Sequence, residues 1–168
     1  MVSFGYTLSS EEHGPAALVE NAREAERRGF DFVSVSDHYH PWVSAQGHSP
    51  FVWSVVGAVA QATLRIGVGI GVTCPTVRIH PAVVAQAAAT TAELLPDRFV
   101  FGVGTGEALN EHILGDRWPR PEMRLAMLDE AIEIIRRLWT GETVDFDGEF
   151  YEVENARLFD PPTTPPPI

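Results

Sequence analysis

Strand-like and helix-like segments alternate from Val2 to Leu138, and this alternation constrains the fold more than any other feature of the chain. The predicted strands are residues 2–8, 30–35, 64–72 and 99–103. The predicted helices are residues 15–28, 49–61, 81–95 and 124–138. Four strand–helix repeats in succession predict a parallel sheet with right-handed crossovers, and hence an α/β fold.

The pattern changes after Gly141. Residues 144–153 alternate around Asp147-Gly148, which predicts a β-hairpin. We therefore expect one domain over residues 1–168, with residues 142–160 as a hairpin excursion within it. The proline-rich residues 161–168 can form either a tail or a connector into a further strand.

Composition excludes several classes of protein. The formal net charge of −11 opposes a nucleic-acid surface, because phosphate binding needs a basic face. No apolar run is long enough to cross a bilayer, so we expect no membrane partner. The single cysteine, Cys74, rules out an intramolecular disulfide and fits a reducing compartment. We therefore expect a cytoplasmic protein.

A first polar cluster, Ser36 to Trp42, directly follows the second predicted strand. Sites in parallel α/β folds lie at the carboxyl ends of the strands. Within the cluster, Asp37 can orient the ring of His38, and Trp42 can supply an apolar wall. We predict a functional role for His38, with a structural histidine as the alternative.

A second cluster follows the fourth predicted strand, with glycines at 102, 104 and 106 before Glu107. These glycines allow a sharp turn and close approach to a planar ligand. Glu107 is either a site carboxylate or an ordinary acid in the first turn of a helix. The spacing lacks the third Gly or Ala of a dinucleotide-binding fingerprint, so that interpretation is rejected.

Other reactive residues give weaker signals. Cys74 follows the third predicted strand and is expected to be buried and inert. His38, His40 and His48 do not have a recognised zinc spacing, so no metal is expected. Glu11 follows the first predicted strand. It either faces the same rim, the edge of the sheet formed by the carboxyl ends of the strands, or belongs to a solvent-exposed segment that leads into a helix.

Three segments together resemble the F420-dependent glucose-6-phosphate dehydrogenase family of luciferase-like flavin and deazaflavin oxidoreductases. They are residues 36–42, 73–82 and 101–111, and the similarity continues through residues 138–141 and the hairpin. The resemblance implies a TIM (β/α)8 barrel. Since such a barrel typically needs about 250 residues, only about the first four β/α units are present in this chain.

The resemblance also implies an activity, the transfer of hydride between a substrate carbon and C5 of coenzyme F420. It assigns catalytic roles to four residues of this chain. His38 matches the base that takes the substrate hydroxyl proton, and Trp42 matches an aromatic residue that steadies the intermediate state. Glu107 matches the proton donor to the deazaflavin ring, and Glu11 matches a further active-site carboxylate.

Cofactor contacts are expected at Asp37, Gly71, Val72, Cys74, Gly106 and Asn110. Gly71-Val72 matches a non-proline cis peptide bond of the family. Cys74 stands where the glucose-6-phosphate enzymes carry a threonine that contacts the cofactor.

The sequence thus predicts an F420-dependent oxidoreductase acting on a sugar or another alcohol as its small-molecule substrate. Two alternatives stay open: a luciferase-like monooxygenase that uses FMN, and a non-catalytic half-barrel that binds cofactor or a partner chain. The sugar-phosphate residues of the family come from its second half, so glucose 6-phosphate itself is not implied. We expect either a homodimer or a missing C-terminal half to complete the barrel.

Overall fold

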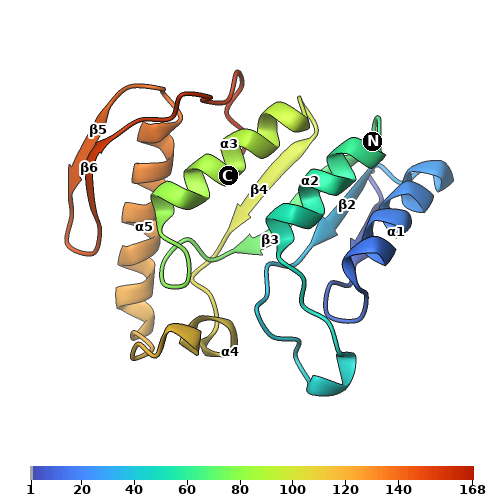
Figure 1. The fold of residues 1–168 in the computed structure, drawn as a ribbon, viewed down its shortest axis with the longest axis horizontal. Helices are drawn as coiled ribbons and strands as arrows, with labels where there is room; N and C mark the ends of the chain where they lie inside the picture. The colour runs from blue at the N-terminus through green and yellow to red at the C-terminus, as the bar shows by residue number, and fades with distance from the viewer. Residues whose placement is uncertain (1) are drawn as a thin grey trace.

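A four-stranded parallel sheet forms the centre of the computed structural model, which describes residues 2–168 (Figure 1). The strands are adjacent in sequence order and consist of β1 (Gly5–Leu8), β2 (Phe32–Val35), β3 (Gly67–Thr73) and β4 (Phe99–Val103). The long helices are α1 (Pro15–Arg28), α2 (Val52–Ala62), α3 (Pro81–Leu94) and α5 (Pro121–Leu138). The parallel α/β arrangement expected from the sequence is therefore confirmed.

Helices α1, α2 and α3 lie side by side against one face of the sheet, and α5 packs next to α3 (Figure 1). Shorter helical turns occupy the loops, namely η1 (Ser44–Gln46), α4 (Ala108–Glu111) and η2 (His112–Leu114). Within residues 2–168, no helix combines the length and the apolar character that a bilayer crossing requires.

The two faces of the sheet differ in burial. Side chains alternate between the faces of a strand, and the helix-facing set is buried: Val33, Val35, Val68, Ile70, Phe99 and Phe101. On the other face Phe32 and Val100 are 41% and 54% exposed. In a parallel barrel both faces of the sheet are covered, so this open apolar face is the one that a complete barrel would enclose.

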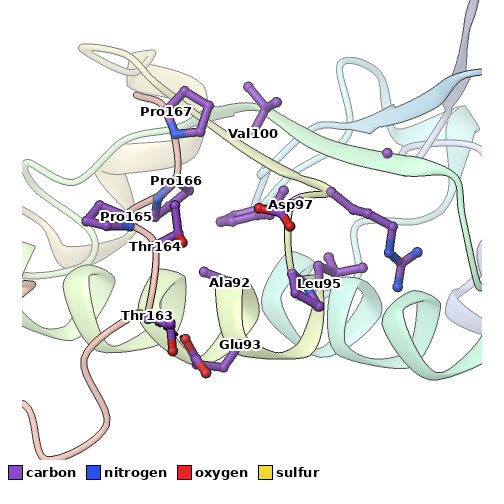
Figure 2. Close-up of a pocket in the computed structure, with 14 residues that line it drawn as sticks. Ala92, Glu93, Leu95, Asp97, Val100, Thr163, Thr164, Pro165, Pro166 and Pro167 are labelled. Atoms are coloured by element: carbon purple, nitrogen blue, oxygen red, sulfur yellow. Dashed lines mark hydrogen bonds between the residues drawn. The ribbon is translucent and has the colours of Figure 1, made fainter.

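The edge of the sheet at β4 contacts the C-terminal segment. The N–H of Phe101 donates to the carbonyl of Pro167 at 3.0 Å, as it would to a neighbouring strand. A cavity of about 580 Å³ separates residues 163–167 from the end of α3 and the start of β4 (Figure 2). This cavity lies at the amino ends of the strands, away from the polar clusters.

The hairpin consists of β5 (Val144–Asp147) and β6 (Glu152–Ala156), which pair antiparallel as expected. Its turn is held by the Glu130 carboxylate, which accepts the N–H groups of Glu149 and Phe150 at 2.8 and 3.0 Å. The Tyr151 hydroxyl donates to the Thr76 carbonyl at 2.8 Å and ties the turn to the loop after β3. The division of the chain into domains stays a prediction.

Several elements begin at positions other than those expected. Strand β1 begins at Gly5 instead of residue 2, β2 at Phe32 instead of residue 30, and β3 at Gly67 instead of residue 64. Helix α5 begins earlier, at Pro121, where a proline at the first helical position costs no hydrogen bond.

The late start of β3 has a clear cause in Glu26 of α1. The Glu26 carboxylate accepts the N–H groups of Leu64, Arg65 and Ile66 at 2.9, 2.6 and 2.9 Å, so these residues do not pair with a strand. Burial by itself would raise the pKa of Glu26, but the backbone donors and the charge of Arg65 lower it overall. A lowered folded-state pKa stabilises the fold above the unfolded-state pKa, and this contribution is lost as the pH falls.

We expect Glu26→Ala to lower the free energy of unfolding by roughly 1–2 kcal/mol at neutral pH, since three N–H groups lose a charged acceptor and water replaces it only in part. The difference from the parent chain should shrink as the pH falls below the unfolded-state value of 4.5. Urea unfolding at neutral pH and near pH 4 measures both effects. Glu24→Ala, which removes an exposed acid paired with Arg28, is the control. Equal losses in the two variants would contradict the assigned role of Glu26.

Candidate active site

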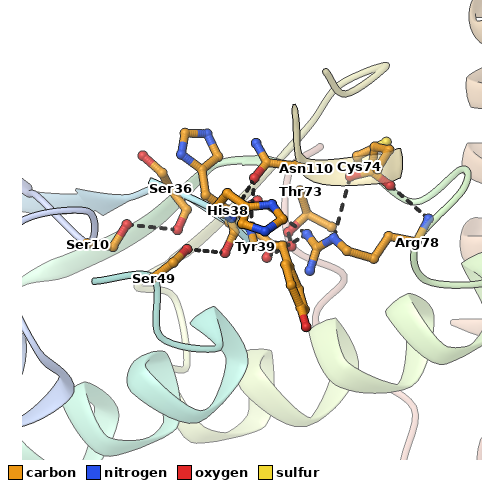
Figure 3. Close-up of polar contacts among 12 residues, drawn as sticks. Ser10, Ser36, His38, Tyr39, Ser49, Thr73, Cys74, Arg78 and Asn110 are labelled. Atoms are coloured by element: carbon orange, nitrogen blue, oxygen red, sulfur yellow. Dashed lines mark hydrogen bonds and ion pairs between the residues drawn. The ribbon is translucent and has the colours of Figure 1, made fainter. Parts of the chain in front are cut away.

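Polar residues following all four strands meet at the carboxyl edge of the sheet. Glu11 comes after β1, His38 after β2, Cys74 after β3 and Glu107 after β4. Because the strands are parallel, their carboxyl ends share one edge, and the structure brings these predicted residues to it. Figure 3 shows two of them, His38 and Cys74.

His38 lies between two carboxylates. Its Nδ1 is 2.7 Å from Oε1 of Glu11, and its Nε2 is 3.8 Å from Oε2 of Glu107. The side chain of Glu11 is 7% exposed and that of Glu107 is 50% exposed. The Glu11 contact is short but not aligned as a regular hydrogen bond. The buried acid lies at Nδ1, and Nε2 is the ring nitrogen nearer the open rim. A histidine that acts as a base requires such an arrangement.

The backbone and ring of His38 are held from two further sides. The hydroxyl of Ser49 donates to the His38 carbonyl at 2.7 Å. The indole of Trp42 meets the imidazole edge to face, with ring centroids 4.9 Å apart and planes at 87°. Trp42 is 55% exposed, so it forms an apolar wall at the open side of His38.

Asn110 links the loop after β2 to Glu107. Its Oδ1 accepts the N–H groups of Tyr39 and His40 at 2.8 and 3.0 Å, and its Nδ2 donates to Oε2 of Glu107 at 3.1 Å. Asn110 is buried and its polar atoms are engaged within the protein. Its predicted contact with a cofactor stays a prediction.

A buried ionic cluster lies beneath the rim (Figure 3). Nη2 of Arg78 is 2.9 Å from Oδ1 of Asp37, and Nε of Arg78 is 3.5 Å from Oε1 of Glu111. The other oxygen of Asp37 accepts the Thr73 hydroxyl at 2.9 Å. The Asp37 carboxylate is thus occupied by protein groups, and its predicted cofactor contact remains untested. Burial raises the pKa of Glu111, although Arg78 opposes the shift.

Sequence reasoning missed Arg78 and Glu111. Arg78 lies within the segment 73–82 that carries the family resemblance, and Glu111 lies four residues after Glu107 at the end of α4. The spacing of four residues from Glu107, which places both side chains on one face of a helix, was the one local signal that Glu111 lies near the site. Nothing local indicated their burial.

The glycines after β4 pack closely against the end of β3. A Cβ on Gly104 would lie 2.7 Å from Cγ2 of Val72, and one on Gly106 would lie 2.5 Å from Sγ of Cys74. Gly106 also has a φ of 74°, which favours glycine. These glycines let the loop pack against the end of β3. Their predicted approach to a planar ligand stays a prediction.

The end of β3 has the expected cis peptide bond between Gly71 and Val72. Cys74 is buried, and its Sγ lies 2.9 Å from Oγ1 of Thr76. Burial raises the pKa of Cys74, which keeps it a neutral thiol and argues against a nucleophile. Among residues 2–168, no group of three or more His, Cys, Asp or Glu side chains is placed to hold a metal ion.

The fold and the site together define a class. Helices cover one face of a four-stranded parallel sheet, and the convergent polar residues lie at its carboxyl edge, as in half of a β/α barrel. Comparison with known proteins agrees with this class. The chain belongs to the luciferase-like monooxygenase family, whose family model matches residues 2–168.

Similarity to known relatives extends over nearly the whole of this chain. An F420-dependent glucose-6-phosphate dehydrogenase of Nakamurella multipartita is 47% identical over 167 residues, which cover 99% of this chain and 49% of that protein. The chain therefore spans about half the length of the curated relatives it matches.

Solved structures give the same result. An F420-dependent secondary alcohol dehydrogenase in complex with an F420-acetone adduct superposes with a TM-score of 0.94 at 37% identity, over 98% of this chain and 50% of that one. A Baeyer-Villiger monooxygenase component in complex with FMN has a TM-score of 0.78 at 18% identity, over 98% of this chain and 49% of that one. The second likeness shows the fold alone.

Proposed function

We propose that this chain is the N-terminal half of an F420-dependent oxidoreductase that transfers hydride between an alcohol, such as a sugar, and C5 of the deazaflavin. The observation that carries the proposal is His38 held between the buried Glu11 and the half-exposed Glu107. One relative is named for glucose 6-phosphate and another for secondary alcohols, so together they support an alcohol as the substrate class.

The open side of β3 fits a flat, largely apolar ring. A Cβ on Gly71 would meet nothing within 4 Å, and Val72 is 46% exposed beside it. In this proposal the cofactor contacts Gly71, Val72 and Gly106 directly, and the buried Asp37, Cys74 and Asn110 support that surface from beneath. Coenzyme F420, when bound, supplies a ring carbon that accepts or donates hydride.

His38 acts in this proposal as the base for the substrate hydroxyl. Glu11 at Nδ1 fixes the ring and stabilises the imidazolium, which leaves Nε2 to take up the proton. Trp42 covers the imidazole and excludes water from this side of the rim. Glu11 and Trp42 thus set the orientation and the surroundings of the base.

Glu107 acts as the second proton-handling group. Its Oε2 is held by the amide of Asn110 at 3.1 Å and faces Nε2 of His38. Half of the side chain is exposed, so it can exchange protons with solvent between turnovers. The protonated carboxyl is the donor toward the deazaflavin side of the site.

We also propose how the open face of the sheet is covered. Phe32 and Val100 are exposed there, which supports a cover formed by the second half of the barrel that the relatives possess, with a second copy of this chain as the alternative. The single cysteine, Cys74, supports a cytoplasmic location.

Cofactor titration tests the proposed function. We expect the chain to bind F420 at least about tenfold more tightly than FMN or NADP, seen as a change in tryptophan fluorescence. Trp42→Phe should remove most of that change, because Trp42 is the exposed indole at the rim. Tighter binding of FMN would identify a monooxygenase. Absence of binding to every cofactor would favour a non-catalytic half-barrel.

A further inference from the structure

Arg78 is the cation of the buried cluster beneath the rim. The side chains of Asp37, Arg78 and Glu111 are 1%, 6% and 1% exposed, so two carboxylates share one guanidinium away from solvent. A buried charge that loses its partner is strongly destabilising. Neutralising these acids is therefore one role of Arg78, but the geometry indicates a second.

The contacts of Arg78 join the two segments that carry His38 and Glu107. Nη2 of Arg78 donates to the carboxylate of Asp37 at 2.9 Å and to its backbone carbonyl at 3.3 Å, directly before His38. The backbone N–H of Arg78 donates to Oε2 of Glu111 at 2.7 Å. Glu111 is the last residue of α4, the helix that begins directly after Glu107. Arg78 thus fixes α4 relative to the end of β2.

A second connection between the same segments depends on this placement. Asn110 precedes Glu111 on α4, accepts the N–H groups of Tyr39 and His40, and donates to Glu107. The backbone N–H of residue 78 keeps its bond to Glu111 in any side-chain variant, but the guanidinium link from Glu111 to Asp37 is lost. If α4 shifts when that link is lost, Asn110 shifts with it. The Tyr39 and His40 N–H groups then lose their acceptor, and Glu107 loses its donor.

We propose that Arg78 is a positioning residue, which keeps His38 and Glu107 at their separation of 3.8 Å by holding α4 against the loop after β2. The importance of that separation rests on the proposed function of His38 and Glu107. The positioning of α4 by Arg78 is a property of the chain without cofactor, so the experiment that tests it uses no cofactor. If the cofactor titration fails, the positioning role of Arg78 is unaffected. If the exchange experiment fails, the proposed function is unaffected.

Hydrogen–deuterium exchange of the chain, read by mass spectrometry, measures the order of the rim. In Arg78→Met, we expect the N–H groups of Tyr39 and His40 to exchange about tenfold faster or more, because their acceptor on α4 is displaced. The N–H groups of residues 148–151, held by Glu130 and the hairpin, should keep their parental rates.

Arg98→Met is the matched control for a general loss of stability. Nη1 of Arg98 donates to Oγ1 of Thr63 and to the Ile66 carbonyl at 3.3 and 3.1 Å, near the amino end of β3. This variant should unfold more easily while the N–H groups of Tyr39 and His40 keep their rates. Equal acceleration in Arg98→Met and Arg78→Met would overturn the proposal.

The double variant Arg78→Met/Glu111→Gln separates positioning from charge neutralisation. Removing one unpaired acid should recover much of the lost thermal stability, while the N–H groups of Tyr39 and His40 remain fast. A return of both to parental rates would show that Arg78 only neutralises the acids, which overturns the proposal. If Arg78→Met fails to fold, Arg78→Lys carries the test, because a lysine keeps the charge but lacks the fork that bridges both segments.

Discussion

His38→Ala is expected to lower kcat by roughly 10²–10⁴, the usual contribution of a positioned general base, when assayed in a chain that carries the complete barrel. The substitution removes Nε2, the atom that faces the rim and Glu107. Cofactor affinity should change little, since the imidazole is assigned to the substrate hydroxyl. Steady-state kinetics with F420 and an alcohol, combined with a cofactor titration, measures both quantities.

His48→Ala is the control for this experiment. His48 is an exposed histidine in the loop between β2 and α2, so its removal should leave kcat within about twofold of the parent, as for most surface substitutions. Turnover of His38→Ala close to that of the parent would show that His38 is a structural histidine.

Glu107→Gln is expected to lower kcat by about 10²–10³ with a smaller change in cofactor affinity, because the amide keeps the shape of the side chain and loses the proton. Oε2 of Glu107 is the atom held by Asn110 and nearest to His38. Glu12→Gln replaces another exposed acid next to Glu11 on the same rim and is the control. A collapse of cofactor affinity with unchanged kcat would reassign Glu107 to binding.

The order of the strands could be predicted because each β/α repeat is encoded locally. Pro15 and Gly29 mark the ends of α1 in the sequence, and the structure has both. The start of β3 could not be predicted, because Leu64 to Ile66 are held by Glu26, which lies 38 or more residues earlier in the chain. A side-chain carboxylate that replaces a strand partner leaves no periodic signal.

The meeting of the candidate site residues at one edge of the sheet could also be predicted. Glu11, His38 and Glu107 each follow a strand, so parallel topology alone brings them to one edge. Arg78 was missed because its partners are separated from it by 41 and 33 residues, and an isolated arginine in a loop resembles a surface residue. Burial of a charge is a property of tertiary packing, which one sequence does not display.

The groups assigned to proton transfer all come from one sheet and its loops. Glu11, His38 and Glu107 follow three of its four strands, and Asn110 and Arg78 link the loops that carry them. The chain therefore holds this arrangement of side chains through its own contacts. Under the proposed function, mutations in the other half of the barrel can alter which alcohol enters while this geometry is kept. Substrate range and proton chemistry are then free to evolve at different rates, each on its own side of the barrel.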